Sequence, residues 1–372
     1  MSETDTARKR RPLSRLLEVT PGEALRREHL TVFPLIAEPQ PGLPYLLLGD
    51  ALDLGVVSIG EIGSGSVPSL VASNRGEVDV LILDGEQLIG AKQNRITNRT
   101  IILEARTETV IPVSYMEQGR WHHVSPEFRS DPKPRHAPPR VRRKAREVEA
   151  AYAAEPLRAA ASVLHQAQGE VWREIAEVGV SMGVSSDTGA MDEIYDRHTE
   201  SLDEWIASFP CSDDQVGLLA FLGRRPLGLD VVGSQALHAR LHERFMGGYV
   251  MDALARRMPH DIKVSGARRD GITRESARRF LSVVGSAPRG KAPTVGKGTY
   301  HLLSGKAIGA ECSDVVESTE RLVHLSAFPG EFGRESGTGS GGSPADESPS
   351  YGPIASPSRR RDWAQGRDSD GS

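Results

Sequence analysis

The chain has 372 residues, with 46 Lys and Arg side chains against 50 Asp and Glu and a formal net charge of −4. This length suits two compact units plus tails, and the near-neutral balance excludes a globally basic nucleic-acid binder. Hydrophobic residues make up 38% of the chain, which indicates that part of its length contributes no core. The sequence predicts an architecture and a candidate site, but it names neither a reaction nor a cofactor.

The sequence favours a cytoplasmic location. No stretch approaches the roughly 18 apolar residues that a membrane span needs, and the charged segment Met1–Pro12 is not followed by an apolar signal region. The two cysteines, Cys211 and Cys312, are too few for a disulfide framework. We therefore expect a protein of the reducing cytoplasm, with neither a membrane nor a nucleic acid as its partner.

Both ends of the chain are predicted to be disordered tails. Residues 1–13 are polar and basic, and residues 331–372 are rich in Gly, Ser and Pro with almost no aliphatic side chains. Neither segment can bury enough apolar surface to offset the entropy lost on ordering. A basic N-terminal arm can also touch nucleic acid or anionic lipid, but we interpret it as a solvated tail.

Residues 14–124 are predicted to form a β-rich domain. Short runs rich in β-branched or apolar residues recur with turn residues between them, which is typical of an antiparallel sandwich or open barrel. Asp84-Gly85, between two such runs, suits the positive φ angles of a type I′ turn and predicts a hairpin. The predicted strands are Leu30–Ala37, Tyr45–Leu48, Val67–Ser73, Val78–Leu83, Thr100–Glu104 and Thr109–Tyr115.

Residues 125–139 are predicted to be a proline-rich connector, because each proline removes a hydrogen-bond donor and disfavours helix before it. Residues 140–210 are then predicted to form a long helical hairpin. Apolar residues alternate steps of four and three from Leu157 to Met182, and a second helical face runs from Met191 to Phe209. The break between these two faces suggests that they pair with each other.

Residues 211–330 are predicted to form a smaller unit with the order ββααββ. Two apolar runs at 216–222 and 227–232 read as a strand pair, and Ser234 and Thr273 are good N-caps for two helices. Thr299–Ile308 and Arg321–Phe328 read as a closing pair of strands. The predicted fold class of the whole chain is therefore α+β.

The basic stretch Arg140–Arg146 opens the first helical segment, where positive charge opposes the helix dipole. This placement allows the stretch to hold an anion or a partner, but we favour a solvated helix start. His122-His123 and the acidic residues nearby lack the ligand spacing typical of a zinc site, and neither cysteine belongs to a Cys-x-x-Cys pair. We accordingly predict no metal site.

The segment Glu86–Asn98 is unusual for a strand, because apolar residues give way to consecutive Lys, Gln, Asn and Arg. Gly90 fits a bulge or a close backbone approach. On a pleated strand these polar residues face both sides and present donors that suit phosphate, amide or ribose groups. The residues that we predict to bind a ligand here are Lys92, Gln93, Asn94, Arg95 and Asn98.

A second polar run, Glu117–His122, follows the last predicted strand of the β-rich domain. Glu117 is the candidate general base, Arg120 a candidate anion ligand and Trp121 a candidate stacking platform. The alternative is structural: Trp121 would plug the sandwich while Arg120 pairs with Glu117, and Lys92–Arg95 would form a polar network that fixes a loop. The residues alone do not decide between the two readings.

Three runs resemble a bacterial family, the ARG and Rhodanese-Phosphatase-superfamily-associated Protein domain. They are Leu83–Arg95, Ile111–Ser114 and Glu117–Trp121, of which the first and the last are specific. The resemblance would cover residues 15–330. The family name records neighbouring genes, ADP-ribosylglycohydrolases among them, so the resemblance implies nucleotide-linked or ADP-ribose-linked biology by association.

Weaker family-like motifs occur in the second half of the chain. Val231-Val232 departs from the apolar–aromatic pair expected after the first of them, which weakens the implied role of this half. The weaker motifs are Gly228–Asp230, Tyr249, Asp252-Ala253 and Val323–Ser326.

Three functions fit these features. The first is a binding module for a phosphate-bearing small molecule, nucleotide-like or ADP-ribose-like, held by the two polar runs. The second is a hydrolase with Glu117 as base and with Lys92 and Arg95 stabilising developing negative charge. The third is a scaffolding protein that recruits a protein partner through the helical seam Leu157–Met182. We expect the binding module.

Overall fold

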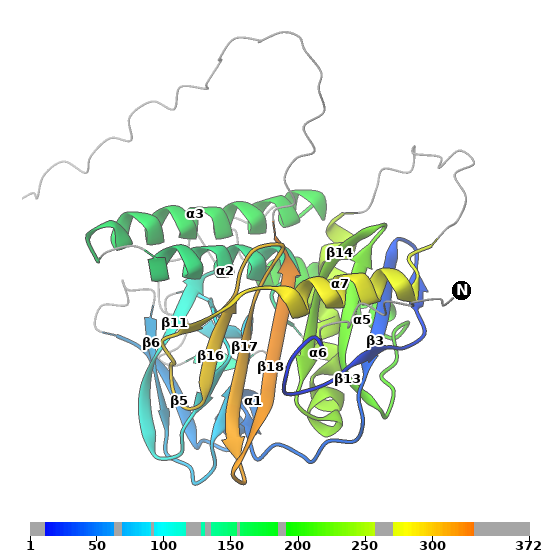
Figure 1. The fold of residues 1–372 in the computed structure, drawn as a ribbon. Helices are drawn as coiled ribbons and strands as arrows, with labels where there is room; N and C mark the ends of the chain where they lie inside the picture. Colours follow the sequence, from blue (N-terminus) through cyan, green and yellow to red (C-terminus); the bar gives the residue numbers. More distant parts are fainter. Residues whose placement is uncertain are drawn as a thin grey trace, which may run out of the picture. The chain divides into compact units, whose positions relative to one another are not determined.

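The computed structural model describes residues 12–62, 69–90, 93–116, 128–130, 135–154, 157–184, 191–256 and 271–330 (Figure 1). These residues all belong to one compact unit, Met1–Phe332. Residues 1–11 and 331–372, which make up most of the two predicted tails, lie outside the described ranges. Helices and mostly antiparallel strands are mixed along the chain, which confirms the predicted α+β class.

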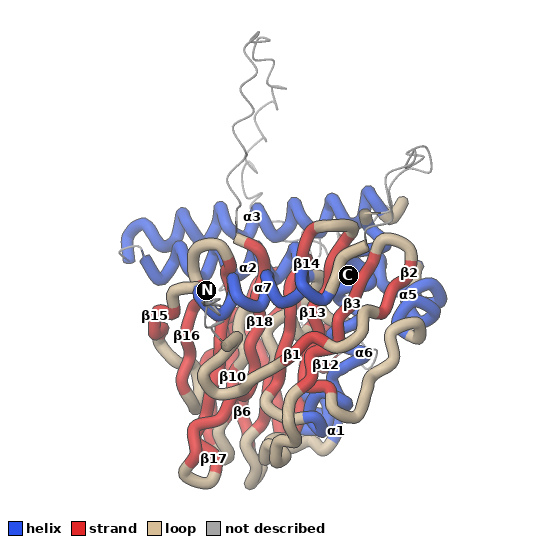
Figure 2. The backbone as a smooth tube through the Cα atoms, turned by 45° about the vertical axis from the view of Figure 1, so that its right-hand side comes forward, coloured by secondary structure: helices blue, strands red, loops and turns tan. Residues whose placement is uncertain are grey.

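The largest sheet has nine strands in the order β1-β3-β13-β14-β18-β17-β16-β15, with β2 also paired to β3 (Figure 2). Every pairing in it is antiparallel. Its strands are β1 (Thr20–Pro21), β2 (Leu25–Arg27), β3 (Leu30–Ile36), β13 (Gln215–Leu222), β14 (Arg225–Val232), β15 (Arg289–Ala292), β16 (Thr299–Leu303), β17 (Ala307–Val316) and β18 (Thr319–Pro329).

Strand β3 joins distant parts of the chain, because it pairs with β13 from Leu30 to Ile36. The predicted segment 14–124 therefore contributes a strand to the sheet built mainly from the predicted segment 211–330. The β13–β14 pair forms as expected. The run predicted as one strand, Thr299–Ile308, is split between β16 and β17, because Gly305 takes a positive φ of 97° in the turn between them.

Two smaller sheets come from the first third of the chain. One has the order β10-β7-β4 and the other the order β12-β8-β9-β11-β6-β5. Only the β4–β7 pair is parallel among the described strands. The strands are β4 (Leu46–Leu47), β5 (Val57–Glu61), β6 (Ser69–Asn74), β7 (Val80–Ile82), β8 (Gln87–Gly90), β9 (Arg95–Thr97), β10 (Ile101–Leu103), β11 (Thr107–Tyr115) and β12 (Phe128–Ser130).

The predicted hairpin at Asp84-Gly85 is wrong. β7 pairs with β10 and β4, whereas β8 pairs with β9 and β12, so this dipeptide connects two sheets. Gly85 does take a positive φ of 78°. A Cβ atom at Gly85 would lie 2.7 Å from Cδ of Arg142, so close packing as well as the backbone angle requires glycine here.

The helices are α1 (Leu48–Asp53), α2 (Pro139–Ala154), α3 (Leu157–Ser181), α4 (Met191–Arg197), α5 (Thr199–Ile206), α6 (Gln235–Ala255) and α7 (Arg274–Ser286). The expected pairing of the helical hairpin needs correction: α2 and α3 lie side by side, joined by a two-residue link (Figures 1 and 2). The predicted second arm is split into α4 and α5. The predicted connector 125–139 also contains a strand, β12.

The large sheet is covered on both faces, and β13 shows how. Leu218 and Ala220 belong to the same apolar cluster as residues of α6, whereas Leu219 and Phe221 belong to the cluster of α7. Because successive side chains of a strand point to opposite faces, α6 and α7 lie on opposite sides of the sheet. This double burial explains the continuous apolar run that predicted the strand.

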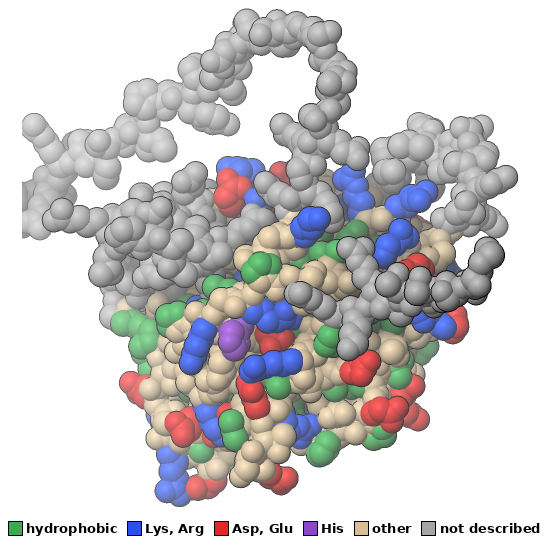
Figure 3. Space-filling view, in the orientation of Figure 1, with side chains coloured by type: hydrophobic (Ala, Val, Ile, Leu, Met, Phe, Trp, Pro, Cys, Tyr) green, Lys and Arg blue, Asp and Glu red, His purple; other side chains and the backbone are tan. Residues whose placement is uncertain are grey.

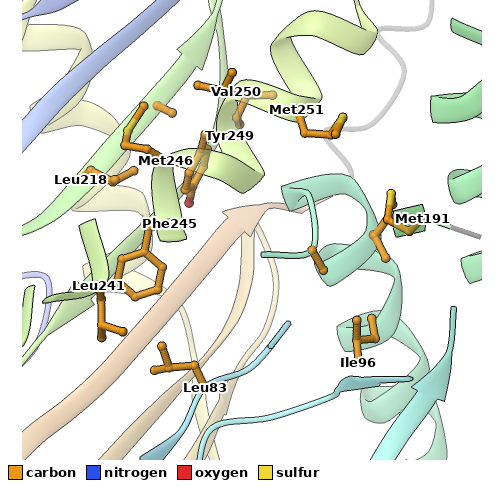
Figure 4. Packing of buried hydrophobic residues seen from close by; sticks show 14 of the residues in the cluster. Leu83, Ile96, Met191, Leu218, Leu241, Phe245, Met246, Tyr249, Val250 and Met251 are labelled. Carbon is orange, nitrogen blue, oxygen red and sulfur yellow. The ribbon is translucent and has the colours of Figure 1, made fainter. Parts of the chain in front are cut away.

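Helix α6 is the centre of the main core. It begins at Ser234, whose side chain accepts a hydrogen bond from the backbone N–H of Leu237 at 3.3 Å, as the sequence predicts. Phe245 and Tyr249 are fully buried in a cluster that also contains Leu83 and Ile96 from the smaller sheets (Figure 4). Within the described residues, no helix combines the length and apolar character that a membrane crossing requires.

We predict that Gly85→Ala destabilises the protein more than Gly55→Ala. Gly55 has a φ of 68°, and a Cβ atom added there would meet no neighbour within 4 Å, so its replacement adds only backbone strain of about 1 kcal/mol. Gly85→Ala adds the collision with Arg142 to a similar strain. Urea denaturation of both variants measures the difference, and equal losses in the free energy of unfolding would contradict the packing argument.

Candidate functional site

The first polar run contains β9, and β9 adjoins β11, the strand that the second polar run follows in the sequence. β9 pairs with β11, with Arg95 opposite Tyr115. The backbone N–H of Met116 then donates to the carbonyl of Asn94 at 3.0 Å. Glu117 follows Met116 directly in the sequence. The described strands therefore place Asn94 and Arg95 of the first run beside Tyr115 and Met116, the last described residues before the second run.

Arg95 lies in the interior of this end of the sheet. Its Nη1 donates to the carbonyl oxygen of Gln93 at 2.7 Å, and its Nη2 lies 3.5 Å from Oε1 of Glu61. The guanidinium also lies 4.0 Å from the centre of the Tyr115 ring. Glu61 balances the charge of Arg95, and the bond to Gln93 places Arg95 to hold the backbone there. The predicted contact of Arg95 with a ligand stays a prediction.

Asn94 and Asn98 also have partners within the fold. The Oδ1 atom of Asn94 accepts from the backbone N–H of Gly90 at 3.1 Å, across a turn in which Gly90 takes a positive φ of 138°. Asn98 is half-buried, and its Oδ1 accepts from the Ser114 hydroxyl at 2.8 Å. These contacts shape the turn and link β9 to β11, as the structural alternative expects.

Gln93 differs from its neighbours. Its side chain is 0% exposed, and neither Oε1 nor Nε2 has a hydrogen-bond partner among the described residues. A buried amide without partners costs about 1–3 kcal/mol of stability, and such groups in native structures need an explanation. Gln93 is thus the predicted site residue whose hydrogen-bonding capacity is still open to a ligand. Lys92, Glu117, Arg120 and Trp121 lie outside the described residues.

A second group of polar residues, which no pattern in the sequence marks as a site, forms a buried ionic cluster. We define it as Asp84, Arg142, Arg146, Asp230 and His324. Arg142 donates to Oδ1 of Asp84 at 2.6 Å and to both carboxylate oxygens of Asp230 at 2.7 and 2.9 Å. Arg146 donates to Oδ2 of Asp84 at 2.5 Å. A carboxylate from the connection between β7 and β8 and a carboxylate from β14 therefore share one arginine.

Hydroxyl groups complete the hydrogen bonding around the cluster. Ser326 donates to Asp84 at 2.6 Å and Tyr249 donates to Asp230 at 2.8 Å. The ring of His324 lies between Thr100, at 2.6 Å, and Asp230, at 3.0 Å. The carboxylates of the ionic cluster are thus matched by donors from α2, α6 and β18.

The electrostatics of the cluster follow from this geometry. Burial by itself would raise the pKa of Asp84 and of Asp230, but Arg142 and His324, joined by Arg146 at Asp84, together outweigh it and hold the pKa of both carboxyls well below its usual range. Burial likewise opposes the charge of Arg142, and the two carboxylates raise its pKa well above the ordinary value. All three groups therefore stay charged in the interior.

The interpretation of Arg140–Arg146 as a solvated helix start is wrong. Arg140 pairs with Asp252 of α6, and Arg142 and Arg146 belong to the ionic cluster. All three arginines are buried. Arg142 and Arg146 are four residues apart and therefore lie on one side of α2, but only the fold shows that this side faces carboxylates. The alternative reading, that the stretch holds anions, was closer: the anions are aspartates of the same chain.

A cavity of about 380 Å³ lies between the segment before β1, the end of α7, and strands β16 and β17. Arg15 and Arg289 line it, but Arg15 pairs with Glu320 and Arg289 donates to Glu311 and to backbone carbonyls. Figure 3 shows charges of both signs interspersed over this face. The cavity therefore lacks the concentrated positive charge that would select an anion.

His136 is buried beside the ionic cluster. Its ring packs edge-on against Phe245 at 5.5 Å between centres, and neither ring nitrogen has a partner among the described residues. Burial, reinforced by the charge of Arg142, lowers its pKa well below the ordinary value. The ring is therefore neutral in the folded protein.

We predict that Arg142→Met lowers the free energy of unfolding by about 3–5 kcal/mol, because two buried carboxylates lose their shared counter-ion. Arg106→Met is the matched control, since Arg106 pairs with Glu77 on the surface, where such pairs contribute up to about 1 kcal/mol. Chemical denaturation measures both variants. A loss at Arg142 no larger than the loss at Arg106 would show that the cluster contributes little to stability.

We predict that His136→Leu flattens the dependence of stability on pH below neutrality. Below about pH 6.5 the unfolded chain binds a proton at His136 that the folded protein excludes, so stability falls as the pH falls. The slope from one such group is up to about 1.4 kcal/mol per pH unit, and the leucine removes it. Denaturation of both proteins between pH 7 and about pH 5 tests this; parallel curves would contradict it.

Comparison with known proteins places the chain in one family. Searches of the curated proteins and of the solved structures gave no match. The family model for the ARG and Rhodanese-Phosphatase-superfamily-associated Protein domain matches residues 18–328. This match spans the strands of the large sheet, the ionic cluster and both polar runs. The chain belongs to the ARG and Rhodanese-Phosphatase-superfamily-associated Protein domain family.

Proposed function

We propose that the chain binds a phosphate-bearing small molecule, of nucleotide or ADP-ribose type, at the end of the β8–β9 pair that carries Gln93 and adjoins the end of β11. The observation that carries this proposal is the Gln93 amide, which is fully buried and unpartnered among the described residues. An amide offers two donors and an acceptor that suit a base edge, a ribose hydroxyl or a carboxamide. A ligand that met these groups would recover the free energy that their burial costs.

In this proposal, some residues position the site and others contact the ligand. Arg95 already interacts with Glu61 and Tyr115, so it positions the turn. Recognition of phosphate then falls to Lys92 and Arg120, and stacking on a ring to Trp121. These roles suit the residue types: lysine acts as a point charge for phosphate, arginine as a planar fork, and indole as a flat apolar surface.

The family supports the class of ligand. Its name associates the domain with other gene products, and ADP-ribosylglycohydrolases among those neighbours act in ADP-ribose-linked biology. This support is associational, since a shared neighbourhood does not specify chemistry. It favours nucleotides and ADP-ribose over other phosphate-bearing ligands.

The two alternatives fare differently. A hydrolase with Glu117 as base would use the same end of the sheet, so turnover of a bound ligand separates it from a binding module. Scaffolding through the helical seam is less favoured. Val171, Ile175 and Val178, which form the described part of that seam on α3, are buried in the main core of this chain.

We predict that ADP-ribose or an adenine nucleotide at millimolar concentration raises the melting temperature of the protein. Gln93→Met should weaken the binding of this ligand at least about tenfold, which corresponds to about 1.4 kcal/mol of binding free energy. The same substitution leaves the unliganded protein as stable or more stable, because it removes a buried unpartnered amide. Calorimetric titration and thermal shift measure the two effects.

Gln215→Met is the matched control. Gln215 is also buried, but its amide accepts from Ser212 at 3.2 Å and donates to Gly217 at 2.9 Å in the large sheet. Its replacement should destabilise the protein and leave ligand affinity unchanged. Failure of every phosphorylated ligand to bind, or unchanged affinity in Gln93→Met, would overturn the proposal. Product formation from a bound ligand, lost in Glu117→Gln, would establish the hydrolase instead.

A further inference from the structure

Three side chains that are good transition-metal ligands meet where the segment after α5 passes α6. His238 and His242 are four residues apart on α6, so they lie on one face of the helix. Cys211 comes from the segment that leads into β13. One ligand atom from each residue lies within 4.8 Å of the other two. Both histidines are buried, whereas Cys211 is exposed.

A backbone carbonyl orients His242. Its Nε2 lies 2.6 Å from the carbonyl oxygen of Phe209, and because a carbonyl only accepts, Nε2 carries the proton. In the neutral ring the lone pair is then on Nδ1. A hydrogen bond of this kind is typical of histidines that bind metals, because it selects the tautomer and fixes the ring. Phe209 belongs to the same segment that supplies Cys211.

The spacing of the two rings suits a shared metal ion. Nδ1 of His242 lies 3.3 Å from Nε2 of His238. Two nitrogens bound tetrahedrally to Zn²⁺ at the usual bond length are about 3.3 Å apart. His238 is also held between His242 and Phe245, whose ring stacks on it at 6.2 Å between centres. The nitrogens are therefore set in rigid surroundings.

We propose that Cys211, His238 and His242 form a zinc-binding site with a fourth position open to solvent. One thiolate and two imidazoles select borderline metals such as Zn²⁺ and Co²⁺ over Mg²⁺ and Ca²⁺, which prefer oxygen ligands. Three protein ligands with an accessible fourth position are typical of zinc sites that bind a water or a substrate. The exposed side of Cys211 provides the entry path.

A direct hydrogen bond between the two rings would also explain their 3.3 Å separation. A hydrogen bond between the rings of His238 and His242 needs no metal ion and does not involve the thiol of Cys211. The participation of Cys211 therefore decides between the two explanations, and the experiment is built around it.

The test uses the full chain, purified without a polyhistidine tag and under reducing conditions. The metal is removed with a chelator and replaced by Co²⁺, whose bond to a thiolate produces a charge-transfer absorption band. We expect one Co²⁺ per chain with this band, and we expect Zn²⁺ to abolish the band by displacement and to raise the melting temperature. Absence of stoichiometric binding, or binding without the band, would overturn the proposal.

Variants assign the ligands. Cys211 is exposed, and Cys211→Ser should abolish the band. Cys312 is still present in this variant, so a surviving band would come from a different thiolate and would overturn the proposal. His242→Gln should lower metal affinity at least about tenfold. His198→Gln is the matched control, since His198 also bonds a backbone carbonyl, that of Met182 at 3.0 Å, but lies outside the site. Equal affinity in His242→Gln and the control would also overturn it.

Discussion

The structure depends on one interaction, the pairing of Arg142 with two buried carboxylates. Asp84 comes from the connection between two small sheets, Asp230 from the large sheet, and Arg142 from α2. An unpaired charge in the interior would cost several kcal/mol. The three elements must therefore meet in the one arrangement that leaves no carboxylate alone. An arrangement that separated these elements would leave a charge buried without its partner, so the cluster penalises such arrangements.

The cluster also supports the proposed ligand site. Asp84 and Gly85 are followed directly by Glu86, which accepts from the backbone N–H of Leu83 at 3.1 Å and pairs with Arg244 of α6 at 3.1 Å. These contacts hold the base of the β8–β9 pair, whose far end carries Gln93. The contacts of Glu86 thus lie at one end of this pair and the unpartnered amide of Gln93 at the other.

The residues that carry the family resemblance are the ones that the fold brings together. Asp84 belongs to the first specific run, while Asp230, Tyr249 and His324 come from motifs that looked weak in the sequence. All four take part in or bond to the ionic cluster. Motifs far apart in the chain therefore become one network. The first specific run, in contrast, ends in β9, which pairs with β11, and the second specific run follows β11 in the sequence.

The sequence by itself determined the elements whose signals are local. The caps at Ser234 and Thr273 form as expected, with side chains that accept from backbone N–H groups three residues on. The long helix α3 also forms where the periodic spacing of apolar residues predicts it, and the β13–β14 pair forms where two apolar runs predict it. These features could be read because a cap, an amphipathic stripe or an alternating strand depends on neighbours within a few residues.

Only the tertiary structure decided the contacts between distant segments. Asp84-Gly85 has the composition of a hairpin turn, yet it links two sheets because Asp84 is bound by Arg142 and Arg146. The basic start of α2 looked solvated because its counter-ions lie far away in the sequence. The convergence of Cys211 with His238 and His242 was hidden for the same reason. Charge pairing and metal ligation are long-range interactions, so their partners become visible only when folding brings them together.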